Sequence, residues 1–177
     1  MPGTPHLFDL TRWLLRAATL FSLFLIAVLA LALAALALAM TGTFHLPIPA
    51  DILDGVPVNQ ILAAGIYAVV TGVICIALAA YIFLLTARIV DTASQGDPFV
   101  IENASRLNRI AWLLLAIQAV GFLCNAVISS LPDKISSHVS GGFDLSATGI
   151  LAALLIFVLA QIFRRGSEMR AELQGTV

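Results

Sequence analysis

Four long runs of apolar residues without a charged side chain dominate this sequence. They extend over residues 17–40, 61–87, 110–131 and 145–163. An α-helix rises about 1.5 Å per residue, so about 20 residues cross the roughly 30 Å hydrocarbon core of a bilayer. Each run is close to that length or longer. We therefore predict four transmembrane helices in a single integral membrane domain over residues 1–177, an all-α four-helix transmembrane bundle.

Composition and the length of the first run argue against a soluble domain and against a cleaved signal peptide. The chain is 60% hydrophobic and 11% charged, whereas a soluble globular domain has about a quarter of charged residues. Ala37 and Ala39 before Met40 resemble a signal-peptidase site, but the first run is much longer than the roughly 7 to 15 apolar residues of a cleaved signal. Cys75 and Cys124 lie inside apolar runs, where a small hydrophobic role is expected rather than a disulfide.

Basic residues predict the orientation. Of the nine Lys and Arg residues, only Lys134 falls on the side opposite the N-terminus. Cytoplasmic loops of membrane proteins carry the excess of bases, and Trp13 and Trp112 lie near the same boundary, where indole rings are enriched. Both termini are therefore predicted to be cytoplasmic, together with the connection between the second and third helices. The bases on that side are Arg12, Arg16, Arg88, Arg106, Arg109, Arg164, Arg165 and Arg170.

The connection between the second and third runs is the longest polar stretch between two apolar ones. Gly96 suits the left-handed conformation that ends a helix continuing to Thr92, and Asp97 suits the cap of a new helix with Pro98 at its first position. The spacing of Glu102 and Arg106 allows an i,i+4 ion pair. We therefore predict a cytoplasmic helical hairpin that extends the second and third helices.

The same stretch supplies the candidate docking residues. Phe99, Asn103, Leu107 and Ile110 share one helical stripe, which continues into the third run. A well-capped turn between two membrane helices explains this pattern, and a surface that docks a partner explains it too. The candidate partner-docking residues are Asp97, Phe99, Glu102, Asn103 and Arg106.

Helix ends and intramembrane polar residues give further predictions. Asp9 is expected to cap the first helix and Asp144 the fourth, and the fourth helix is expected to emerge by two or three turns beyond Phe163. Ala68 and Gly72 mark a face of the second helix that admits close packing. In the third run, Gln118 and Asn125 are the candidate intramembrane polar contacts; Asn125 is expected to face the second helix, near Thr71 or Tyr67.

No catalytic, cofactor-binding or metal-binding residue is predicted. The spacings typical of nucleotide-binding loops, zinc proteases and serine hydrolases are absent, and no acidic or basic residue lies in the middle of a run, where it would indicate an ion pathway. Arg164, Arg165 and Arg170 resemble a site for anionic lipid headgroups, although the topology alone requires bases there. The polar residues of the outer loops lack the spacing of a metal site and are read as solvated; they are His45, Asp51, Asp54, Asp133, His138 and Asp144.

Several short motifs occur together in the connection and the tail: Gly96-Asp97-Pro98-Phe99, Glu102-Asn103 and Arg106-Leu107, followed by Ile162-Phe163, Gly166 and Thr176-Val177. In these motifs the chain resembles domain-of-unknown-function family 2975, a group of short bacterial four-helix membrane proteins. The tail departs from the family, because members often have an acidic and an apolar residue where Gln174 and Gly175 stand. The resemblance implies a multi-pass protein of the cell inner membrane, often encoded beside a small helix-turn-helix regulator, and no established activity.

These observations favour a non-enzymatic regulatory or interaction protein that presents the cytoplasmic hairpin to a partner. That partner would be a cytoplasmic helix-turn-helix regulator or another membrane protein, in addition to the lipid bilayer, and no direct contact with nucleic acid is expected. The alternative is a subunit of an oligomeric channel or transporter, in which Gln118, Asn125, Ser129 and Ser130 line a path. A membrane enzyme is the third class and has no motif in its favour.

Overall fold

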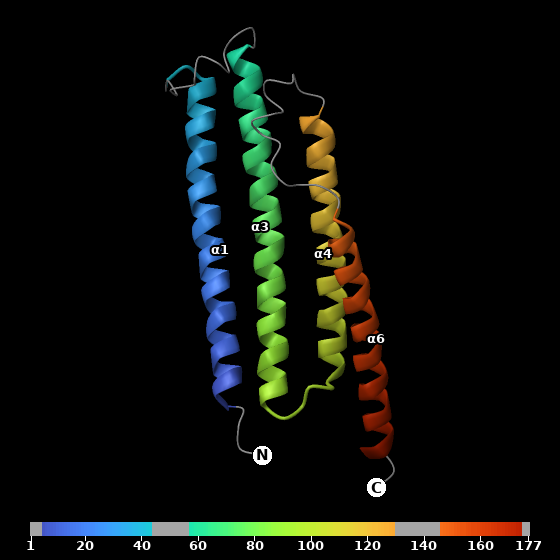
Figure 1. Ribbon diagram of the computed structural model, residues 1–177. Coiled ribbons are helices and arrows are strands. Elements are labelled where there is room, and N and C mark those ends of the chain that lie inside the picture. The colour runs from blue at the N-terminus through green and yellow to red at the C-terminus, as the bar shows by residue number, and fades with distance from the viewer. Residues whose placement is uncertain (1–4, 44–56, 130–145, 175–177) are drawn as a thin grey trace. The chain divides into compact units, whose positions relative to one another are not determined.

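The described part of the chain folds into four α-helices and contains no β-strand (Figure 1). The computed structural model describes residues 5–43, 57–129 and 146–174. Each helix covers nearly all of one predicted apolar run and is long and apolar enough to cross a membrane. The prediction of an all-α multi-pass membrane protein is therefore confirmed. The helices are α1 (Pro5–Met40), α3 (Val58–Ser94), α4 (Ile101–Ile128) and α6 (Ala147–Gln174).

The helix starts differ from the predicted caps. α1 begins at Pro5, because proline lacks the N–H that the first turn leaves unpaired and its φ is already helical. Asp9 therefore lies inside α1 and not at its cap, with its Oδ1 3.8 Å from an Arg12 nitrogen. α6 begins at Ala147, and Ser146 Oγ accepts a hydrogen bond from the Gly149 N–H at 3.3 Å, which is the geometry of an N-cap. The predicted cap Asp144 lies outside the described residues.

The ends of α4 and α6 differ in where they lie relative to their apolar runs, because α4 ends within its run and α6 continues beyond its own. α4 ends at Ile128, just before Ser129, whose hydroxyl donates to the Asn125 carbonyl and satisfies an end carbonyl. α6 continues past Phe163 to Gln174, so the predicted extension of the fourth helix beyond its apolar run is confirmed. The outer-loop His and Asp residues lie outside the described ranges, as does Ser130.

The chain divides into two compact units, which are described separately. The first unit comprises Met1–Ser22, Leu78–Ala116 and Ser146–Val177. It contains the start of α1, the end of α3, the connection between α3 and α4, the first part of α4, and α6. Buried alanines lie on both α4 and α6, at Ala104, Ala111, Ala153 and Ala160, and small residues permit close helix packing where lipid supplies no hydrophobic drive.

The second unit, Leu23–Ala77 with Ile117–Leu145, has glycines at its helix contact. A Cβ on Gly65 would lie 3.4 Å from a Leu36 methyl, and one on Gly72 would lie 3.6 Å from a Leu29 methyl. The glycine face of α3 therefore packs against leucines of α1, spaced seven residues apart on both helices. Tyr67 Oη donates to the Leu123 carbonyl at 3.4 Å, and so connects α3 to α4.

Candidate functional site

The connection between α3 and α4 is the centre of the candidate site, and its first turn forms as predicted. α3 continues to Ser94, two residues beyond Thr92. Gly96 then adopts a φ of 91°, and its N–H donates to the Ala93 carbonyl at 3.2 Å. This left-handed glycine turn satisfies a carbonyl that the helix end would otherwise leave unpaired.

Asn103 fixes the rest of the connection. Its side chain is 0% exposed. Its Nδ2 donates to Thr92 Oγ1 at 2.7 Å and to the Pro98 carbonyl at 3.0 Å, and its Oδ1 accepts from Arg106 at 2.7 Å. Both amide hydrogens are used. The single side chain therefore joins the end of α3, the irregular connection and the first turns of α4.

The predicted cap at Asp97 is wrong. α4 begins at Ile101, and the Asn103 N–H donates to the Val100 carbonyl at 3.0 Å in the preceding turn. A residue before proline is disfavoured in the helical region, so Asp97 before Pro98 stays irregular. Its carboxylate instead accepts a hydrogen bond from Arg170 of α6, as part of an ion pair between them.

The predicted Glu102–Arg106 pair is also wrong. Arg106 donates to Asn103 Oδ1 and, at 3.4 Å, to the Arg88 carbonyl. The Asn103 amide oxygen lies only three residues away on α4 and is buried, and a buried acceptor left unpaired costs about 1 to 3 kcal/mol. An exposed i,i+4 ion pair contributes only a few tenths of a kcal/mol, so Arg106 binds the amide. Glu102 stays exposed at the surface of α4.

The start of α1 holds the end of α3. Arg12 Nε lies 2.7 Å from Asp91 Oδ1, and Arg12 also donates to the Ser94 hydroxyl. The Nε contact is an ion pair and not a hydrogen bond, because Nε is buried and its N–H finds no partner at hydrogen-bond geometry. Both side chains are partly solvated, so the pair contributes less than about 1 kcal/mol. Its main effect is to fix where α1 lies against the connection.

The end of α6 holds the connection from another side. The rings of Phe99 and Phe163 lie 5.1 Å apart between centroids, within the range of favourable aromatic pairs. A Cβ on Gly166 would lie 3.0 Å from Phe99 Cδ1, so a larger residue there requires the ring to shift. The four residues of the predicted stripe therefore have two different environments. Asn103, Leu107 and Ile110 are buried in the first unit, whereas Phe99 is partly exposed and packs on α6.

A groove of about 400 Å³ lies between this connection and the end of α6. We call it the connection groove. Phe99 is 43% exposed and Ile101 48% exposed, and they give it an apolar surface. Glu102 and Glu168 add negative charge to its lining. The groove is lined by Asp97, Phe99, Val100, Ile101, Glu102, Ser167, Glu168, Arg170 and Ala171.

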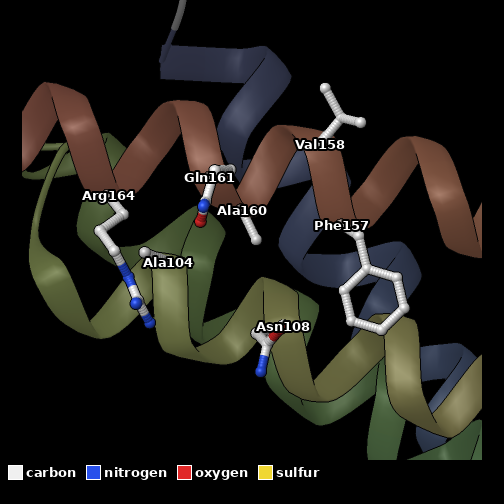
Figure 2. A pocket seen from close by; sticks show the side chains of 7 residues that line it. All are labelled: Ala104, Asn108, Phe157, Val158, Ala160, Gln161 and Arg164. Carbon is white, nitrogen blue, oxygen red and sulfur yellow. The ribbon is translucent and has the colours of Figure 1, made fainter.

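A second pocket, of about 350 Å³, lies between α4 and α6 (Figure 2). Its polar lining residues are Asn108, Gln161 and Arg164. In Figure 2, Arg164 and Phe157 extend from α6 toward α4, whereas Val158 points away from it. Phe157 meets Trp112 edge to face at 5.5 Å. The sequence predicts no pocket here, although the amide of Gln161 inside an apolar run indicates a polar contact between helices.

The structure thus separates the predicted site residues into three groups. Asp97, Phe99 and Glu102 line the connection groove. Asn103 and Arg106 form the hydrogen-bond network beneath it. Gln118 and Asn125 belong to the second unit, where both are half-buried and both have interaction partners.

Comparison with known proteins identifies one family. A family model described as "Protein of unknown function (DUF2975)" matches residues 43–177. No curated protein and no solved structure matches the chain.

Within the described ranges, no group of three His, Cys, Asp or Glu side chains is placed to hold a metal ion.

Proposed function

The chain belongs to the family of proteins of unknown function DUF2975, and we propose that it is a non-enzymatic regulatory or interaction protein of the bacterial cell inner membrane. It presents the connection groove to a cytoplasmic partner. Both termini and the α3–α4 connection lie in the cytoplasm in this proposal, as the distribution of bases indicates.

Contacts within the first unit support a shared side for these segments. Arg12 of α1 contacts Asp91 of α3, and Arg170 of α6 contacts Asp97 of the connection. Three polar segments far apart in the sequence therefore meet directly. Two helices, α1 and α3, separate the first segment from the connection, and two more, α4 and α6, separate the connection from the end of α6. If each helix crosses the membrane once, all three segments lie on the same side.

One observation carries the docking proposal: the connection is tied by hydrogen bonds and contacts to three helices, yet it leaves apolar side chains uncovered. Asn103 and the contacts with α1 and α6 fix the backbone, while Phe99 and Ile101 stay nearly half exposed beside an otherwise polar connection. A surface ordered in advance loses little conformational freedom when it binds. A turn that only joins two helices needs neither feature.

The chemistry of the groove indicates the kind of partner. Phe99 and Ile101 suit an inserted apolar side chain, and Glu102 and Glu168 suit neighbouring bases. A basic amphipathic helix offers both on one face. Nucleic-acid-binding proteins carry such basic surfaces, which agrees with the helix-turn-helix regulator that the family resemblance implies.

Photo-crosslinking in growing cells tests the proposal. A photoreactive phenylalanine analogue is placed at Ile101 in the groove, and, as the matched control, at Ile162, an exposed isoleucine on the apolar part of α6. We expect a discrete protein adduct from position 101 only, and its loss when Glu102→Lys and Glu168→Lys are added. The same adducts at both positions, or an adduct at 101 that survives charge reversal, would contradict docking in the groove.

A further inference from the structure

A third pocket, of about 400 Å³, lies between α3 and α4. We call it the arginine pocket. Its polar lining is Arg88, Ser105, Arg106, Arg109 and Glu102, and Leu85 is its buried apolar side. Arg88 is the first charged residue after the apolar run of α3, and Arg109 is the last before that of α4. The pocket therefore lies where these helices leave the hydrocarbon and enter the headgroup region.

The pocket has an excess of positive charge. Three arginines and one glutamate, Glu102, line it. In the part of the chain that the structure describes, Arg88 and Arg109 form no ion pair, whereas Arg12 pairs with Asp9 and Asp91, and Arg170 pairs with Asp97. Arg106 is fixed by Asn103 Oδ1 and the Arg88 carbonyl. Like charges held together in this way are stabilised by a bound anion.

The arginines of α6 do not converge in the same way. Arg170 is neutralised by Asp97, and Arg164 lines the pocket with Asn108 and Gln161. The headgroup site suggested by the sequence at Arg164, Arg165 and Arg170 is therefore divided between different surroundings. The convergent site lies instead between α3 and α4.

We propose that the arginine pocket binds the phosphate of an anionic phospholipid, such as phosphatidylglycerol. Guanidinium groups bind phosphate oxygens through paired hydrogen bonds, and basic pockets between membrane helices accept anionic headgroups. Ser105 adds a hydroxyl, and Leu85, on the membrane side of Arg88, supplies the apolar lining next to the glycerol and upper acyl chain. This pocket shares Ile101 and Glu102 with the connection groove, but Arg88, Arg106 and Arg109 line the arginine pocket and not the groove. Substitution of these arginines therefore tests lipid binding separately from the docking function proposed above. A soluble organophosphate carries the same phosphate but lacks the acyl chain, so the test separates the two sources.

Native mass spectrometry of the delipidated full-length protein in neutral detergent provides the test. Phosphatidylglycerol, phosphatidylcholine and glycerol 1-phosphate are titrated in parallel. The test variant is Arg88→Gln with Arg109→Gln, and the matched control is Arg164→Gln with Arg165→Gln, which removes the same charge from exposed positions. Each arginine near an anionic headgroup contributes about fivefold in affinity, so the test pair should lose about 25-fold for phosphatidylglycerol, while the control changes by less than about threefold.

Three results would overturn the proposal. They are undiminished phosphatidylglycerol binding by the test variant, an equal loss in the control, and equal binding of glycerol 1-phosphate and the lipid. Arg88 and Arg109 are both exposed and outside the Asn103 network, so folding is expected to survive. Should the double variant not fold, Arg109→Gln alone should lose about fivefold, and no loss there would overturn the proposal equally.

Discussion

Replacing Asn103 by leucine should be the most destabilising single change in the connection. The amide is fully buried, and it forms two hydrogen bonds as a donor and one as an acceptor from a charged side chain. A neutral hydrogen bond contributes about 1 kcal/mol net and one to a charged group about 1.5 to 3 kcal/mol. The sum is roughly 3 to 5 kcal/mol. Arg106 can turn toward water in the variant and regain part of this free energy. We therefore expect Asn103→Leu to lower the free energy of unfolding by about 3 kcal/mol.

Thermal unfolding in detergent measures this loss. For a chain of this length, 1 kcal/mol lowers Tm by about 2 to 4 °C, so Asn103→Leu should lower it by about 6 to 12 °C. Asn108→Leu is the matched control on the same helix, because Asn108 is half-buried and forms no hydrogen bond within the described residues. It should change Tm by less than about 2 °C. Equal shifts in the two variants would refute the reasoning that the amide network holds the connection.

Three other substitutions have expected outcomes. Gly96→Ala should cost about 1 kcal/mol in a detergent melt, because φ is 91° although no atom crowds the new methyl; Gln95→Ala, the control, should cost little. Gly166→Leu should cost about 1 to 3 kcal/mol by overpacking Phe99, and Phe99→Ala should relieve it in a double-mutant cycle. Asn125→Leu should lower Tm or alter the oligomeric state, because an amide in hydrocarbon requires a partner; no change in either would place Asn125 toward lipid.

Sequence predicted the existence of the helices well because bilayer thickness sets a minimum length for each apolar run; the helices themselves have 28 to 37 residues and extend beyond it. A backbone inside hydrocarbon must satisfy its own polar groups, so an apolar run of about 20 residues has few alternatives to a helix. Gly96 was predictable for a similar local reason, since a positive φ strongly favours glycine. The burial of Asn103 was not predicted: the sequence placed it among the docking residues, but it is 0% exposed and cannot contact a partner directly.

The side-chain partners in the connection were not predictable from local rules. Capping preference assigned Asp97 to the start of α4, but the carboxylate is bound by Arg170, 73 residues away. Helical spacing assigned Arg106 to Glu102, but a buried amide on the same helix provides a better acceptor. Asp97 is held by a tertiary contact that no short window of sequence contains. Arg106 binds an amide only three residues away, but that amide is buried only because the connection packs over it. Each contact outweighs an exposed local interaction of a few tenths of a kcal/mol. Gln161 and Asn108 were missed because the pocket that they line exists only when α4 and α6 pack.

Cysteine accessibility in intact cells tests most directly whether the connection between α3 and α4 faces the cytoplasm. Single cysteines at Asp54, Gln95 and Ser137, in a chain lacking Cys75 and Cys124, are treated with a membrane-impermeant maleimide before and after permeabilisation. Positions 54 and 137 should label in intact cells, whereas position 95, on the exposed turn after α3, should label only after permeabilisation. Labelling of position 95 in intact cells would place the connection groove outside the cell and contradict a cytoplasmic partner.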